Sequence, residues 1–105
     1  MRDIGLTEQE ERKLTDLLAR YPKVEKAVIY GSRAKGNHRK FSDIDLTLCG
    51  QTLSISDLNK IDNAIDNLLL PYDVDLSIFD KLKNKALIEH IKRVGITIYT
   101  KKHEE

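Results

Sequence analysis

The chain has 105 residues, 40% of them hydrophobic and 33% charged, and we expect one compact domain over 1–105 with no room for a second core. Eighteen Lys and Arg nearly cancel seventeen Asp and Glu, which leaves a formal charge of +1 and makes nucleic-acid binding through bulk charge unexpected. Cys49 is the only cysteine, which excludes an internal disulfide and a cysteine-rich zinc site and favours a reducing compartment.

The first predicted elements are a helix over about 7–20 and a buried strand over 24–30. Thr7 followed by Glu10 is a capping-box pattern, and apolar residues recur behind it at helical spacing. The strand is a β-rich run that stops at Gly31, where we expect a tight turn.

Residues 31–40 are polar and basic and contain two glycines, which indicates a functional loop or short helix. Residues 43–49 then alternate strictly, which predicts a strand with its apolar side chains on one face. Asp43 and Asp45 lie on the other face, which we expect to be polar.

A second helix is predicted to be capped by Ser54 or Ser56, with an apolar stripe that extends to Leu69. A third strand over 73–79 alternates in the same manner as the second. Asp80 is then predicted to cap a final helix.

Gly95 is predicted to end this helix in a left-handed C-cap conformation, before a short edge strand over 96–99. Residues 101–105 are interpreted as a frayed tail. The order α-β-(loop or α)-β-α-β-α-β predicts an α/β fold, a small mixed β-sheet flanked by helices. Because no apolar run can span a bilayer and no signal-peptide pattern is present, we expect a cytoplasmic protein without membrane contact.

The strongest functional signal is a glycine turn followed by carboxylates on strands. Gly31 permits a positive φ, and Ser32 adds a hydroxyl and an N–H that can face a phosphate oxygen. Asp43 and Asp45 leave one strand face about 7 Å apart, and Asp75 joins them if the two strands are close in the sheet. Hard oxygen ligands of this kind suit Mg²⁺ or Mn²⁺. The alternative is that they are ordinary exposed residues on a solvated face.

Basic residues suit a polyphosphate near this turn, although a solvated run of charge is the alternative. They are Arg33, Lys35, Arg39 and Lys40. Of the histidines, His38 could face the phosphates, whereas His90 and His103 are interpreted as surface residues. Cys49 is interpreted as a packing residue and not as a nucleophile.

These residues resemble the active-site signature of the minimal nucleotidyltransferases, within the DNA polymerase β-like nucleotidyltransferase superfamily. The signature is a Gly31-Ser32 pair, ten intervening residues, and then Asp43 and Asp45. Asp75 matches the third carboxylate of the family, and the match in order and length runs from about residue 7 to 100. The resemblance implies the family fold and transfer of a nucleoside monophosphate, usually AMP from ATP, onto a hydroxyl.

The resemblance also implies roles for the residues of the turn and the short basic segment. Gly31 and Ser32 would cradle the β and γ phosphates of ATP. Arg33 and Lys35 would neutralise charge on the pyrophosphate leaving group.

The resemblance assigns the carboxylates to metal binding and proton transfer. Asp43 and Asp45 would hold Mg²⁺, or Mn²⁺, against the triphosphate. Asp75 would help to bind the catalytic metal and take the proton of the attacking hydroxyl, a role for which Asp73 is a rival on spacing alone.

The family's minimal members are paired with a helical HEPN-type protein, so the resemblance implies an antitoxin that adenylylates a tyrosine of a HEPN ribonuclease toxin. One alternative is a small-molecule nucleotidyltransferase of the antibiotic-modifying type. Another is a non-catalytic antitoxin that neutralises its partner by contact.

Overall fold

The fold is a single four-stranded sheet with helices on both faces, seen in a computed structural model that describes residues 4–36 and 42–102. In chain order the elements are α1 (Glu8–Leu18), β1 (Lys26–Tyr30), α2 (Ser32–Lys35), β2 (Ile44–Cys49), α3 (Ile55–Asp66), β3 (Val74–Ile78), the 3₁₀ helix η1 (Phe79–Lys81), α4 (Lys85–Val94) and β4 (Ile96–Thr100). The predictions for His38, Arg39, Lys40 and His103 lie outside the described residues.

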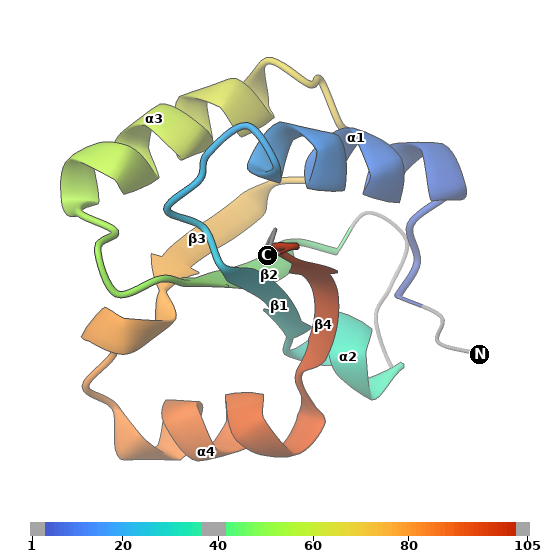
Figure 1. The fold of residues 1–105 in the computed structure, drawn as a ribbon. Helices are drawn as coiled ribbons and strands as arrows, with labels where there is room; N and C mark the ends of the chain where they lie inside the picture. Colours follow the sequence, from blue (N-terminus) through green and yellow to red (C-terminus); the bar gives the residue numbers. More distant parts are fainter. Residues whose placement is uncertain (1–3, 37–41, 103–105) are drawn as a thin grey trace.

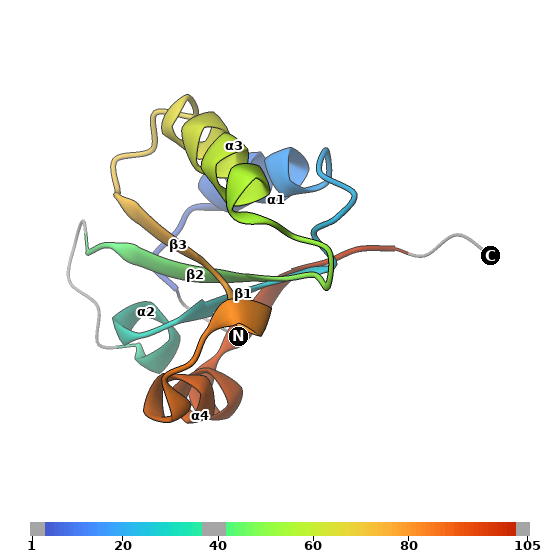
Figure 2. The same ribbon diagram turned by 90° about the vertical axis from the view of Figure 1, so that its left-hand side faces the viewer.

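The strand order is β3-β2-β1-β4, with β1 antiparallel to both β2 and β4, and β2 parallel to β3. The predicted mixed sheet and the edge position of the last strand are therefore confirmed. Helices α1 and α3 cover one face, while α2 and α4 lie on the other (Figures 1 and 2). No helix in the described ranges is long and apolar enough to cross a membrane.

The two long helices on the upper face in Figure 1 begin as predicted. The Thr7 hydroxyl accepts a hydrogen bond from the Glu10 N–H (3.0 Å), and the Glu10 carboxylate accepts one from the Thr7 N–H (2.9 Å). Ser54, and not Ser56, caps α3 through the same reciprocal arrangement with Asp57. Each capping box satisfies N–H groups that the first helical turn leaves unpaired.

The start of the last helix differs from the prediction. Asn84, not Asp80, caps α4 by accepting a hydrogen bond from the Leu87 N–H (3.1 Å). Asp80 lies instead in η1, where its carboxylate accepts a hydrogen bond from the Gly50 N–H (3.2 Å). The chain therefore makes an extra 3₁₀ turn before the helix, which the Asp-based interpretation missed.

The end of that helix also differs, because Gly95 has φ −59° and ψ 140° and is not left-handed. A glycine is required there for space: a Cβ would overlap the Ile91 carbonyl and lie 2.6 Å from Val28 Cγ1. Leu69 was predicted to belong to the apolar stripe of α3, yet it is 86% exposed and has φ +56°. Helix α3 ends at Asp66, so Leu69 is outside the helical spacing.

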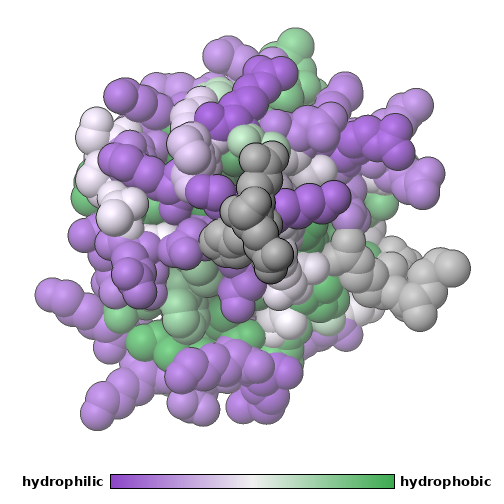
Figure 3. Space-filling view, in the orientation of Figure 1, coloured by the Kyte–Doolittle hydropathy of each residue, from purple (hydrophilic) through white to green (hydrophobic). Residues whose placement is uncertain are grey.

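The main core lies between the sheet and the pair α1 and α3. Inward-facing strand residues such as Ile29 and Leu46 pack there with Leu14 of α1 and Ile61 of α3, all four fully buried. A smaller cluster, formed by Val28 and Tyr30 of β1 and Ile91 of α4, lies between the sheet and α4. In Figure 3 hydrophobic side chains gather toward the bottom, where α4 packs under the sheet.

Beyond β4 the chain is still attached to the sheet region. The Lys101 N–H donates to the Glu25 carbonyl (2.8 Å), and its ammonium group donates to the Pro22 carbonyl (2.9 Å). Residues 103–105 of the predicted tail lie outside the described part of the chain.

Candidate active site

Three polar side chains form one row across three neighbouring strands. Tyr30 of β1 is the register partner of Asp45 of β2, and Asp45 is the register partner of Asp75 of β3. Residues in register on adjacent strands point to the same face of a sheet. The strands that carry Asp45 and Asp75 are therefore neighbours, which is the condition that the sequence left open. Asp43 is exposed and directly precedes β2.

The electrostatics of Asp45 show that carboxylates are concentrated at this point. Burial raises the pKa of Asp45, and the charges of Asp75 and Asp43 raise it further, while His90 and Arg33 lower it. Both neighbouring carboxylates named by the sequence are thus close enough to act on Asp45.

Asp73, the rival of Asp75, has a backbone role in the sheet. Its carbonyl accepts a hydrogen bond from the Ile44 N–H (2.8 Å), and its side chain is exposed. The register places Asp75, not Asp73, beside Asp45. This geometry favours Asp75 as the third carboxylate.

The glycine turn lies directly against the carboxylate row. Gly31 has φ +75° and forms the N-cap of α2. A Cβ at this position would overlap Asp45 Oδ2 and lie 3.3 Å from the carboxyl carbon, so only glycine lets the turn approach so closely. Ser32 begins α2 and is half-buried, whereas Lys35 ends α2 and is exposed.

His90 belongs to this site, although the sequence interpretation placed it at the surface. Its Nε2 accepts a hydrogen bond from the Gly31 N–H (3.1 Å), and its ring meets that of Tyr30 edge-on at a centroid distance of 6.2 Å. The one available sequence signal was spacing: His90 is three residues after Leu87 and four before Val94, on the predicted buried side of its helix.

Tyr30 is the second residue that sequence reasoning left without a role. Burial raises the pKa of its phenol, a hydrogen bond with Ser77 lowers it, and the charges of Asp45 and Asp75 raise it. The phenol therefore lies beside the carboxylates and remains protonated. Its place in the row depends on strand register, which the sequence alone did not determine.

Arg33 is buried and is not free to reach a phosphate in this structure. Its side chain is 1% exposed and donates hydrogen bonds to the carbonyl oxygens of Ile4, Ser42 and Asp43. Of the two basic residues assigned to the pyrophosphate, Lys35 is the one with an exposed side chain.

The metal-binding prediction fits the chemistry of these side chains, although the described residues do not form a complete set of metal ligands. Among the described residues, no group of three or more His, Cys, Asp or Glu is arranged to hold a metal ion. Mg²⁺, however, is typically held by one or two carboxylates together with phosphate oxygens of the substrate. A cation beside Asp45 would also offset the causes that raise its pKa, which are burial first and then repulsion by Asp75 and Asp43.

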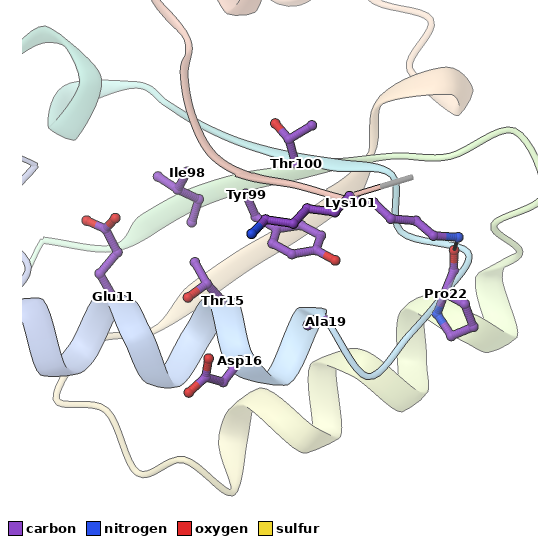
Figure 4. A pocket seen from close by; sticks show the side chains of 10 residues that line it. Glu11, Thr15, Asp16, Ala19, Pro22, Ile98, Tyr99, Thr100 and Lys101 are labelled. Carbon is purple, nitrogen blue, oxygen red and sulfur yellow. Dashed lines mark hydrogen bonds between the residues drawn. The ribbon is translucent and has the colours of Figure 1, made fainter. Parts of the chain in front are cut away.

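Two other features lie away from the row. A hollow of about 710 Å³ between α1 and β4 is lined by residues such as Thr15, Tyr99 and Lys101 and includes none of the predicted site residues (Figure 4). Cys49 is half-buried, and burial raises the pKa of its thiol, which agrees with packing and not with nucleophilic chemistry.

Comparison with protein families gives a match over residues 12–104 to the family described as polymerase beta, nucleotidyltransferase. Comparison with curated proteins gives no significant match.

The chain is similar in fold to chains of solved toxin-antitoxin structures. One, a toxin-antitoxin with AMP-PNP, has a TM-score of 0.71 at 23% identity, over 88% of this chain and 74% of that chain. A second, a tri-AMPylated Shewanella oneidensis HEPN toxin in complex with MNT antitoxin, has a TM-score of 0.68 at 20% identity, over 91% and 74%. A third, the toxin-antitoxin MntA-HepT, has a TM-score of 0.67 at 21% identity, over 90% and 74%.

Proposed function

The chain belongs to the polymerase beta nucleotidyltransferase family, and on this premise we propose that it transfers AMP from ATP, with Mg²⁺, to a hydroxyl group of a partner protein. The observation that carries the proposal is the pairing of Asp45 with Asp75 on adjacent parallel strands, directly beneath the Gly31 turn. A phosphate-binding turn and a pair of carboxylates are what a phosphoryl-type transfer needs at one point.

The site residues take the roles that the family resemblance gives them, with one exception. Gly31 and Ser32 hold the β and γ phosphates, and Lys35 neutralises charge on the pyrophosphate as it leaves. The exception is Arg33, whose guanidinium is occupied by carbonyl oxygens.

The carboxylates would hold the metal ion, and one of them would receive the proton. Asp43 and Asp45, with Asp75, would bind Mg²⁺ or Mn²⁺, which when bound would neutralise negative charge developing on the phosphates. Asp75 accepts the proton of the attacking hydroxyl, because its exposed side chain lies in register with Asp45.

The acceptor we propose is a tyrosine of a HEPN-type ribonuclease, so that the chain acts as the antitoxin of a toxin-antitoxin pair. Two observations support this. One structural neighbour is a tri-AMPylated HEPN toxin in complex with MNT antitoxin. Asp43 and Asp75 are also exposed, so a side chain of another molecule can approach them. We further propose that 1–105 is a single minimal nucleotidyltransferase domain acting in the cytoplasm.

The direct test is incubation of the protein with Mg²⁺, ATP labelled at the α-phosphate, and the product of the adjacent gene as the candidate partner. Label should appear on the partner, and an Asp43→Asn, Asp45→Asn double variant should abolish it. Asp16→Asn, which changes an exposed carboxylate on α1, is the matched control and should label normally. If the double variant still neutralises the toxin, the chain acts by contact. If ATP binds but no protein is labelled, a small-molecule acceptor is favoured.

A further inference from the structure

Arg33 makes an unusual set of contacts for a charged residue beside a nucleotide-binding turn. Its Nη1 donates to the Ile4 carbonyl (2.8 Å), and its Nε lies within hydrogen-bond distance of the carbonyls of Ser42 (3.2 Å) and Asp43 (3.3 Å). Nη2 donates to Ser42 as well. A guanidinium carries five donors in a planar fork, and here the fork is directed at the backbone just before β2.

The same guanidinium also contacts the segment that leads into β3. Its Cζ lies 4.5 Å from the ring centroid of Tyr72, close enough for a cation–π interaction. Tyr72 is three residues before Asp75, and its hydroxyl lies 3.4 Å from the Gly5 carbonyl and 3.3 Å from the Glu10 carboxylate. One side chain therefore joins α2 to the segments that precede both carboxylate-bearing strands.

The contacts of Arg33 bear on the position of Asp43. Asp43 precedes the first residue of β2, so its own position is not set by being inside a strand. The bond from Arg33 to the Asp43 carbonyl supplies a fixed point there, and Arg33 itself follows the Gly31-Ser32 pair by one residue. Arg33 thus contacts the backbone of Asp43 and, through the Tyr72 ring, the segment that leads to Asp75.

We infer that Arg33 is a positioning residue, which fixes Asp43 and Asp75 relative to the Gly31 turn and does not contact phosphate. The inference rests on the proposed function and changes the role that the sequence pattern gave to Arg33. Lysine cannot replace it, because one ammonium group lacks the planar fork and stacks poorly on a ring.

The test compares Arg33→Lys, Lys35→Gln and Leu17→Ala by steady-state kinetics, at a temperature where circular dichroism shows all three folded. Arg33→Lys should lower kcat by about 100-fold, as a misplacement near 1 Å does, with KM for ATP almost unchanged. Lys35→Gln should raise KM instead. Leu17→Ala destabilises the opposite face of the sheet and should keep its kcat. A raised KM with normal kcat in Arg33→Lys would overturn the inference, as would equal losses in Arg33→Lys and Leu17→Ala.

A second pair of variants keeps the inference testable if Arg33→Lys does not fold. Tyr72→Leu removes the ring beneath the guanidinium, whereas Tyr72→Phe keeps the ring and removes only the hydroxyl. Tyr72→Leu should lower kcat by about tenfold with KM retained, and Tyr72→Phe should remain near wild type. Equal kinetics in the two variants would contradict the positioning role of the Arg33–Tyr72 contact.

The inference can fail separately from the proposed function. If the wild-type protein transfers no AMP, the proposed function fails, and Arg33 is then judged by amide resonances in nitrogen-15 spectra. Arg33→Lys, or Tyr72→Leu in its place, should shift the amides of Asp43 and Asp75 and leave those of α3 unchanged. Unshifted Asp43 and Asp75 amides would overturn the positioning role.

Discussion

The two faces of the sheet differ in what their side chains do. On the face covered by α1 and α3, β2 contributes Ile44, Leu46 and Leu48, all fully buried in the main core. On the face covered by α2 and α4, the same strand contributes Asp45 and Thr47. One strand thus supplies stability to one side and chemistry to the other, because alternate side chains of a strand point in opposite directions.

The second face was expected to be polar, and part of it is buried. Thr47 is fully buried, and its hydroxyl accepts a hydrogen bond from the Ser77 hydroxyl (2.9 Å). Next to it, Val28 and Ile91 form part of the small cluster between the sheet and α4. The difference teaches that the apolar α1 and α3 face must hold the fold together, so that carboxylates can be kept close together on the other side at a cost to stability.

The largest expected effect comes from removing one carboxylate charge on the face covered by α2 and α4. Asp45→Asn should lower transfer by about 10³-fold, since a metal-binding carboxylate contributes several kcal/mol to the transition state. The thermal midpoint should not fall. Asp16→Asn on α1 is the control and should retain full activity. An active Asp45→Asn enzyme would show that the row is not the catalytic site.

A change in the main core, on the face covered by α1 and α3, should affect stability and not activity. Leu14→Ala removes a fully buried side chain of α1 and should cost about 2–5 kcal/mol of unfolding free energy. Chemical denaturation measures this loss, and kcat should be normal wherever the variant is folded. A fall in kcat at such temperatures would mean that the two faces are coupled more closely than the fold indicates.

The two glycines at the ends of α2 both have positive φ, with Gly31 at ψ −149° and Gly36 in the left-handed region at ψ 9°, and they allow backbone strain to be compared with contact at the site. Gly31→Ala and Gly36→Ala both place alanine at positive φ, which costs about 1–3 kcal/mol. Only at Gly31 would the new Cβ also meet the Asp45 carboxylate; at Gly36 no atom of the described residues 4–36 and 42–102 lies within 4 Å of it. Activity should therefore be lost in Gly31→Ala and kept in Gly36→Ala, and equal activities would argue against a tight turn against Asp45.

Variants of His90 test whether α4 contributes to activity or only packs against the sheet. His90→Ala leaves the Gly31 N–H without its acceptor and should lower kcat/KM by about tenfold, which corresponds to one lost hydrogen bond. His90→Gln offers an amide oxygen and should recover part of the loss. Glu89→Ala, an exposed neighbour on α4, controls for changes in the helix. Normal activity in His90→Ala would assign His90 to packing alone.

The smallest effect is on the pH dependence of stability. The pKa of folded Asp45 lies above its ordinary value of 3.8, chiefly through burial and then through Asp75 and Asp43. Folded protein therefore binds this proton more tightly than unfolded protein, and the associated stability is present below pH 3.8 and is lost as pH rises through the raised pKa. At pH 7 Asp45→Asn should melt slightly higher than wild type.

The measurement is the difference between the melting temperatures of the two proteins from pH 3.5 to 7. The difference should vanish at the acid end, where Asp45 is protonated. Asp57 behaves oppositely, because hydrogen bonds from Ser54 lower its pKa and its stabilisation is lost as pH falls. It is present in both proteins, so its effect cancels. A constant difference across the range would contradict a raised Asp45 pKa.

Local signals in the sequence predicted most of the elements. The capping boxes at Thr7 and Ser54 are short-range hydrogen-bond patterns, so they could be recognised from spacing. Spacing was ambiguous where two residues that can both cap a helix lie close together. Asp80 is a suitable N-cap residue, but Asn84 is the N-cap of α4. Gly95 was interpreted as a conformational glycine, whereas packing against Ile91 and Val28 is what requires it.

The sequence by itself determined which carboxylates and which glycine turn are candidates for the site, and which residues of β2 lie on each face. Each of these depends on the order and spacing of neighbouring residues. Only the tertiary structure decided which strands are adjacent, and hence that Tyr30, Asp45 and Asp75 form one row. It also decided that His90, 59 residues from Gly31, meets the turn. Register and helix docking come from burying apolar surface between distant segments, and that balance cannot be read from any local pattern.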